Sequence, residues 1–193
     1  MQLPRLDRRL WAAALALATL AAPARAFGVD DLMALLARQE KGEARFTEQR
    51  FVRGVDGPLQ SAGVLDFEPP DKLVRRTTSP RPESMSVDGN QLVMQRGGRT
   101  RTTTLDSLPE VQGMIEAMRG TLMGNALQLQ RYFRTKLSGD EKAWTLDLDP
   151  IDRALAAQVR SLRITGRGGQ VLGVEMEFVG GDRSVMDIVP GAP

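Results

Sequence analysis

The chain has 193 residues, with 26 basic and 24 acidic side chains and neither cysteine nor histidine. The lack of both residue types excludes a Ser-His-Asp triad, a cysteine nucleophile, and zinc or haem ligated by His or Cys. It also excludes disulfides, so the fold must be held together by its core alone.

The first 26 residues have the pattern of a cleavable secretory signal peptide. Three arginines precede an apolar run, Leu10 to Ala22, which is followed by Ala24-Arg25-Ala26, a small-x-small cleavage site. Cleavage after Ala26 removes four Arg and one Asp, so 26 basic residues become 22 and 24 acidic residues become 23. The resulting net charge of −1 does not support attraction to nucleic acid.

Residues 27–193 have a length that suits a single domain. No later stretch approaches the roughly 20 apolar residues needed to span a bilayer. An exported chain without cysteine fits the periplasm of a Gram-negative bacterium better than an extracellular animal setting, where disulfides are usual. We therefore expect a periplasmic protein.

The expected domain begins with a helix and a strand. Val29 to Glu40 is predicted as an amphipathic helix, with Asp30 at the N-cap position and three leucines on one face. Ala44 to Val52 is predicted as a strand. Its two large apolar residues, Phe46 and Phe51, have opposite parity, so we expect either a bulge or one Phe outside the core.

The stretch from Ser61 to Met94 is predicted as antiparallel sheet with one apolar face. Apolar residues alternate along it, Pro and Gly separate its extended runs, and Asp88-Gly89 is a strong hairpin signal. Thr100 to Leu105, rich in β-branched residues, is predicted as a further strand.

After Pro109 the apolar period becomes that of a helix. The helical positions are Val111, Met114, Ile115, Met118 and Leu122. Ala126 to Tyr132 is predicted as a shorter helix, and Pro150 to Gln158 as a loop or a single helical turn. Strand patterns return in Phe133–Ser138, Trp144–Leu148, Val159–Thr165, Leu172–Phe178 and Ser184–Ile188. The sequence thus predicts an α+β domain with about 10–11 strands and two or three helices.

This order of elements resembles LolA, the family of periplasmic carriers of outer-membrane lipoproteins. Motif agreement lies in Ala44-Arg45-Phe46-Thr47-Glu48-Gln49, in Gly63-Val64-Leu65, and in Thr78 to Met94. The resemblance implies a curved antiparallel sheet, open as a half-barrel, with helices covering its concave face as a lid. It also implies a carrier that binds acyl chains of a lipid or lipoprotein in an apolar cavity and shuttles them from the inner to the outer membrane.

Such a carrier solves a definite physical problem. Each methylene removed from a membrane costs about 0.8 kcal/mol, so a 16-carbon chain costs about 12 kcal/mol. The resemblance implies that the cavity and lid are lined by Phe46, Leu65, Phe67, Met85, Val87, Leu92, Met94, Val111, Met114, Ile115, Met118, Leu122, Trp144, Leu146, Met176 and Phe178. Methionine suits a surface that repacks around variable ligands, although it is also ordinary core filler.

Two positions differ from the family pattern. Pro69-Pro70 stands where the family has an Arg-Pro pair, and Arg75 stands where it has an aromatic residue, commonly Trp. In well-studied carriers the family's Arg is tied to lid closure and cargo release. The differences place the chain in a divergent branch, some members of which are thought to serve other lipids such as aryl polyene or glycolipid products.

Arginines gather on the first group of strands. Arg75, Arg76, Arg99 and Arg101 are candidates for a basic rim that meets anionic headgroups or an acidic partner. The alternative is a solvated outer face of the sheet that also protects strand edges. The sequence leaves both open.

Two other classes of function remain as alternatives. One is a sensing module of the same fold that detects lipid and signals to a membrane partner. The other is a lipid-modifying enzyme, which would need carboxylates, Lys or Tyr as acid and base; no such pair occupies apolar positions. We expect a monomer without catalysis, cofactor, metal or nucleic acid, with an acylated cargo, an inner-membrane donor and an outer-membrane acceptor as partners.

Overall fold

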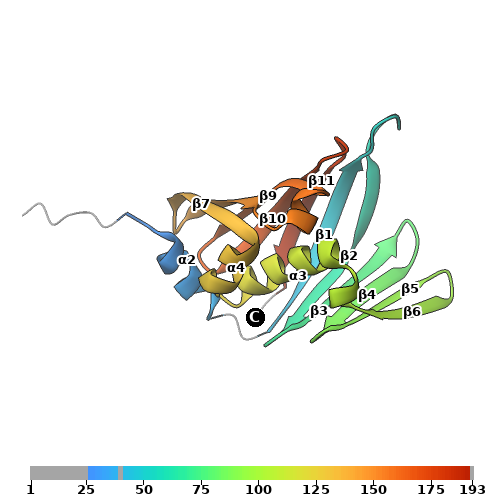
Figure 1. Ribbon diagram of the computed structural model, residues 1–193, viewed down its shortest axis with the longest axis horizontal. Coiled ribbons are helices and arrows are strands. Elements are labelled where there is room, and N and C mark those ends of the chain that lie inside the picture. The colour runs from blue at the N-terminus through green and yellow to red at the C-terminus, as the bar shows by residue number, and fades with distance from the viewer. Residues whose placement is uncertain (1–25, 39–40, 192–193) are drawn as a thin grey trace, which may run out of the picture.

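The computed structural model describes residues 26–38 and 41–191, and Figure 1 shows their arrangement. The signal peptide predicted for 1–26 lies, except for its last residue, outside the described residues. Within the described part of the chain, no helix is both long and apolar enough to cross a bilayer.

In the described part of the chain, eleven strands form one sheet in which every neighbouring pair is antiparallel. Their order across the sheet is β6-β5-β4-β3-β2-β1-β11-β10-β9-β8-β7. The strands are β1 (Gly42–Phe51), β2 (Leu59–Glu68), β3 (Lys72–Ser79), β4 (Glu83–Asp88), β5 (Gln91–Arg96), β6 (Arg99–Thr104), β7 (Phe133–Asp140), β8 (Ala143–Pro150), β9 (Val159–Arg167), β10 (Gln170–Phe178) and β11 (Arg183–Pro190).

The helices interrupt the strands at two places after an N-terminal helix. They are α2 (Val29–Leu36), a 3-10 turn at Leu105–Ser107, α3 (Pro109–Leu122), α4 (Ala126–Tyr132) and α5 (Arg153–Ala156). The predicted loop or single turn before β9 is therefore the short helix α5, which Asp152 caps by accepting a hydrogen bond from the amide of Leu155 at 2.9 Å.

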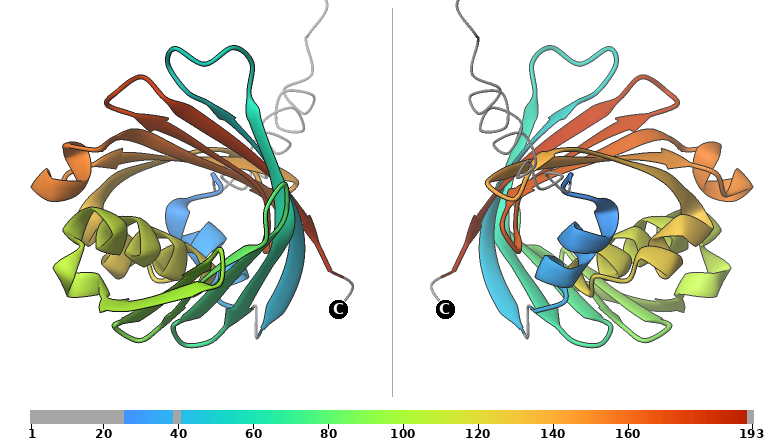
Figure 2. Two further views of the ribbon diagram at one scale, coloured as in Figure 1. Left: turned by 90° about the vertical axis from the view of Figure 1, so that its right-hand side faces the viewer. Right: turned by 90° about the vertical axis from the view of Figure 1, so that its left-hand side faces the viewer.

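The chain path explains why the helices lie on the open side of the sheet. Strands β1 to β6 form a meander that ends at one edge, and β7 to β11 form a second meander that starts at the other edge and returns to pair with β1. Helices α3 and α4 connect β6 to β7 across the concave side of the curved sheet (Figure 2). The sheet is not closed, because its edge strands β6 and β7 do not pair with each other.

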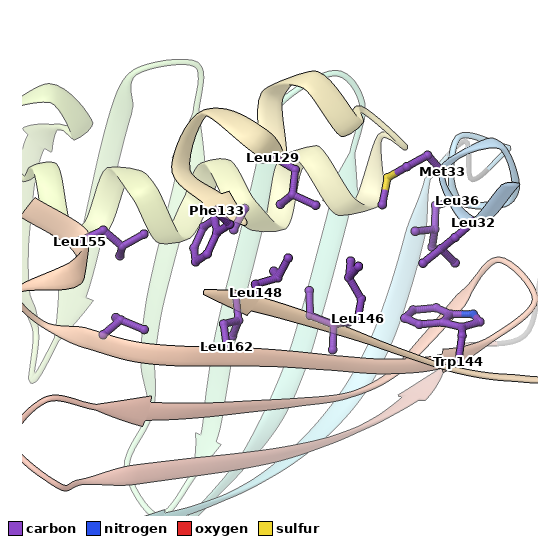
Figure 3. Packing of buried hydrophobic residues seen from close by; sticks show 13 residues of the cluster. Leu32, Met33, Leu36, Leu129, Phe133, Trp144, Leu146, Leu148, Leu155 and Leu162 are labelled. Carbon is purple, nitrogen blue, oxygen red and sulfur yellow. The ribbon is translucent and has the colours of Figure 1, made fainter. Parts of the chain in front are cut away.

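One end of the concave face carries a tightly packed core, here called the packed cluster (Figure 3). Helix α2 places Leu32, Met33 and Leu36 against the inner side chains of β7 to β9, and α4 and α5 add Leu129 and Leu155. Trp144 also donates from its indole nitrogen to the carbonyl oxygen of Gly168 at 2.9 Å. The remaining buried members are Ala117, Phe133, Trp144, Leu146, Leu148, Val159, Leu162 and Ile164.

The turn between α3 and α4 depends on a glycine. Gly124 has a φ of +60°, and a Cβ at this position would lie 2.0 Å from the carbonyl oxygen of Met33 in α2. Glycine is suited to a positive φ and allows this close approach of backbones. Gly124 thereby lets α2 pack against the end of α3.

In α2 the structure corrects the predicted N-cap, and in β1 it decides between the two explanations for Phe46 and Phe51. The N-cap of α2 is Gly28, whose amide donates to Asp31 at 2.9 Å, so Asp30 is not the cap. Phe46 is buried on the concave face, whereas Phe51 is 40% exposed at the end of β1. The opposite parity of the two Phe therefore reflects one ring outside the core.

Candidate functional site

The other end of the concave face carries a second apolar group, here called the methionine-rich cluster. Its buried members come from β2 to β5, the 3-10 turn and α3: Phe67, Leu73, Val87, Leu92, Leu105 and Ile115. Its partly exposed members are Met85, Met94, Leu108, Val111, Met118, Leu122 and Met123. Four methionines thus line the region between α3 and the sheet, and none of them is fully buried.

Most of the predicted cavity residues belong to one of the two clusters. The methionine-rich cluster brings together Phe67, Met85, Val87, Leu92, Met94, Val111, Ile115, Met118 and Leu122. Met176 and Phe178 are partly buried against the packed cluster. Met114 is half-buried and belongs to neither cluster, and Leu65 is half-buried on β2.

Trp144 and Leu146 offer almost no surface to a ligand. They are 2% and 0% exposed, respectively, because both are packed inside the packed cluster, in which α2 lies near Trp144 (Figure 3). These two predicted lining residues are core residues in this conformation.

Phe46 and Arg75 meet at the centre of the concave face. Gly63 lies opposite Phe46 in β2, and a Cβ on Gly63 would lie 2.9 Å from the Phe46 ring. The missing side chain leaves room for the ring, over which the Arg75 guanidinium lies at 4.6 Å from the centroid. A cation over an aromatic face is attracted by the ring quadrupole, so Phe46 helps to fix Arg75.

Arg75 also pairs with Glu48, two residues along β1 from Phe46. Its Nη2 donates to Glu48 Oε2 at 2.5 Å, and the side chains are 29% and 14% exposed. Ser184 donates to Oε1 at 2.5 Å and Ser61 donates to Oε2 at 3.1 Å. A charged pair and two hydroxyls thus lie on a face that is otherwise largely apolar.

The surroundings of Glu48 keep it ionised. Burial alone would raise the pKa of its carboxyl group, but the hydrogen bond from Ser184 and the charge and hydrogen bond of Arg75 outweigh burial. The pKa of Glu48 therefore lies below its ordinary value. At neutral pH, Glu48 is therefore the carboxylate that accepts the hydrogen bonds of Arg75, Ser61 and Ser184.

Arg119 joins α3 to the sheet. It is 6% exposed, and its guanidinium donates to the carbonyl oxygen of Asp71 and, at 2.8 Å, to that of Gly89. Asp71 lies between β2 and β3, and Gly89 lies between β4 and β5. Arg119 Nη1 also contacts Glu116 at 3.0 Å, and Glu116 accepts a hydrogen bond from Gln128 of α4. One buried cation therefore holds α3 against two turns.

The structure does not bring the four candidate basic-rim residues together. Arg75 is on the concave face, whereas Arg76 is on the convex face and pairs with Asp66 at 2.7 Å. Arg99 and Arg101 lie on the exposed edge strand β6.

Sequence reasoning missed Glu48, Ser61, Ser184 and Arg119. Glu48 shares the parity of Ala44 and Phe46 in β1, so a carboxylate on the apolar face was visible in the pattern. Arg119 lies four residues after Ile115 and three before Leu122, on the apolar side of α3. A charged residue in register with apolar ones was the signal in both cases.

The family model described as outer membrane lipoprotein carrier protein LolA-like matches residues 21–192, so the chain belongs to this family. The comparison with curated proteins gives no match.

Solved structures give distant likenesses. A LolA superfamily protein from Nitrosomonas europaea is 12% identical, with 86% of this chain and 93% of that chain covered and a TM-score of 0.46. A putative outer membrane lipoprotein-sorting protein domain from Vibrio parahaemolyticus is 11% identical, with coverages of 82% and 89% and a TM-score of 0.42. LprF from Mycobacterium bovis is 10% identical, with coverages of 86% and 93% and a TM-score of 0.38.

Proposed function

We propose that the protein binds the acyl chains of a lipid or lipoprotein between α3 and the concave face and carries them through the periplasm from the inner to the outer membrane. The proposal involves no chemical conversion of the cargo. Membership of the LolA-like family supports lipid or lipoprotein binding. The predicted signal peptide supports export.

The observation that carries the proposal is the methionine-rich cluster. Met85 and Met94 pack against this cluster from adjacent strands, and Met118 and Met123 pack against it from α3 and its C-terminal end. All four are partly exposed although they contact a buried core. Unbranched, polarisable side chains can change rotamer to surround an acyl chain at low cost. A core that served stability alone would be better filled by side chains with fewer rotamers.

Helix α3 is the lid in this proposal. Its apolar residues contact the same strands that would hold the chain, and Arg119 binds two turns at the rim of the sheet. Movement of α3 away from β3 to β5 would expose the methionine-rich cluster. Opening requires the Arg119 hydrogen bonds to break, so the lid remains shut unless cargo or a membrane partner compensates for them.

A transfer experiment tests the proposal. The protein is incubated with vesicles that contain a fluorescent acyl lipid, separated from them, and then mixed with unlabelled acceptor vesicles. A carrier extracts the lipid in stoichiometric amount and delivers it. Extraction without delivery would favour the sensing alternative, and failure to extract would contradict acyl binding itself.

A further inference from the structure

The Arg75 guanidinium has unused hydrogen-bond donors on the concave face. Its hydrogen bonds to Glu48 and Ser61 both come from Nη2. Among the described residues, Nε and Nη1 have no hydrogen-bond acceptor, although 29% of the side chain is exposed. Arginine carries five N–H donors and no acceptor. This part of the face therefore has donors to spare.

The acceptor oxygens of Glu48, beside Arg75, are largely occupied. Glu48 accepts from Ser184 through one oxygen and from Arg75 and Ser61 through the other. A ligand group that needs to donate finds little here, whereas a group that accepts finds Nε and Nη1 of Arg75. The unused groups are N–H donors of Arg75, which would bind an oxygen acceptor.

The position of Arg75 places such an acceptor at the end of an apolar chain. Its neighbours across the sheet are Leu65 on β2 and Met85 on β4, and Met94 pairs with Met85 on the next strand. Met85 and Met94 belong to the methionine-rich cluster under α3. An acyl chain in that cluster would thus have its polar end within reach of the guanidinium.

The charges on this side of the sheet favour an anion over a neutral acceptor. Glu48 balances Arg75, and Glu83 balances Arg96 at 3.4 Å. Arg99 and Arg101, on the edge strand β6, share the parity of these inward residues by register with Arg96 and Met94. The inward-facing charges of β3 to β6 that are left after these two pairs, those of Arg99 and Arg101, are therefore positive.

We propose that Arg75 binds an anionic oxygen group, a carboxylate or a phosphate, at the polar end of the acyl ligand, with Glu48 and Phe46 holding the guanidinium in position. The inference rests on the proposed acyl binding and adds the chemical class of the headgroup. Glu48 orients Arg75 and at the same time repels the anion, so it limits the affinity that Arg75 provides.

Four amphiphiles with one 12-carbon chain test the inference by displacement of the neutral fluorescent probe N-phenyl-1-naphthylamine. They are dodecanoate, dodecyl phosphate, dodecanol and dodecyltrimethylammonium. The two anions should bind about tenfold more tightly than the alcohol, as expected for one charge-assisted hydrogen bond partly offset by desolvation. A preference for only one anion identifies the source as carboxylate or phosphate, and either result supports the inference.

Two variants should act in opposite directions. Arg75→Gln should abolish the preference for anions while leaving the affinity for dodecanol within about twofold. Glu48→Gln removes the opposing charge and should strengthen anion binding severalfold, a gain that misfolding cannot imitate. Arg134→Gln, on the convex side of β7, is the control for loss of one positive charge and should match the wild type.

The outcomes separate this inference from the proposed function. Equal affinity for all four amphiphiles, or an anion preference unchanged in both Arg75→Gln and Glu48→Gln, overturns the role of Arg75 alone. Failure of every amphiphile to displace the probe contradicts acyl binding. If Arg75→Gln does not fold, the headgroup series and Glu48→Gln still decide the matter.

Discussion

Arg119 on α3 donates from both Nε and Nη2 to the backbone carbonyl oxygen of Asp71, at 2.8 and 2.5 Å. A planar guanidinium can make such paired contacts, and lysine cannot. Because Asp71 follows Pro69-Pro70, this contact joins α3 to the segment where the family pattern has its Arg-Pro pair. Here the arginine is on the helix, and the carbonyl is in the turn between β2 and β3.

Replacing Arg119 should loosen α3. Arg119→Met leaves Glu116 without its cation and two turn carbonyls without their donor, so we expect a loss of about 3–5 kcal/mol in unfolding free energy. Arg119→Lys keeps the charge but loses the paired N–H donors of the guanidinium. Its unfolding free energy should lie between those of Arg119→Met and the wild type. Urea denaturation measures the stability, and hydrogen exchange of residues 109–122 measures local opening.

A control for this variant is available on α4. Arg131→Met removes an exposed arginine and should change neither quantity measurably. Unchanged exchange of α3 in Arg119→Met would show that the helix is held by its apolar face alone.

Glu48 should make stability depend on pH. Its pKa is lowered in the folded state, so its contribution is fully present above the unfolded value near 4.5 and is lost as pH falls through the folded value. Glu48→Gln should therefore lose less unfolding free energy than the wild type between pH 7 and pH 3. Denaturation midpoints at the two pH values provide the test. An equal loss in both proteins would mean that Glu48 does not sense pH.

A charge at Met118 should abolish acyl binding without unfolding the protein. Met118→Asp places a charge in the methionine-rich cluster, where the side chain is only partly buried and can reorient towards solvent. We expect a folded protein whose uptake of a fluorescent fatty acid is abolished. Leu127→Asp, at a position 77% exposed on α4, should leave uptake unchanged. Unfolding of Met118→Asp would show that Met118 is an ordinary core residue.

The two clusters should respond differently to truncation. Leu146→Ala, in the packed cluster at 0% exposure, should cost about 2–5 kcal/mol of unfolding free energy while the protein that remains folded binds acyl probes normally. Met94→Ala should cost about 1 kcal/mol because the side chain is partly exposed, yet weaken acyl binding. Calorimetry and probe titration of both variants provide the comparison. Weaker acyl binding in Leu146→Ala but not in Met94→Ala would place the ligand in the packed cluster.

Local patterns predicted the strands and α3 well, because side-chain alternation and the Asp88-Gly89 turn are encoded within a few residues. They could not show that α2 joins Trp144 and Leu146 in one buried cluster, since these segments are about a hundred residues apart. Adjacent residues of one strand lie on opposite faces, so Arg75 and Arg76 could not share one rim. Which of the two faces inward depends on how β3 pairs with its neighbours. The site at Glu48 brings together residues of four strands, β1, β2, β3 and β11, and their alignment is not encoded locally.

The most direct test of the central claim is native mass spectrometry of the protein after export to the periplasm and purification without detergent. The proposed function predicts a complex heavier than the polypeptide, from which denaturation releases an acylated molecule. With the proposed role of Arg75, that molecule should carry a carboxylate or a phosphate. A mass equal to the polypeptide alone, together with no uptake of fluorescent fatty acid, would contradict acyl binding and leave the methionine-rich cluster as packing.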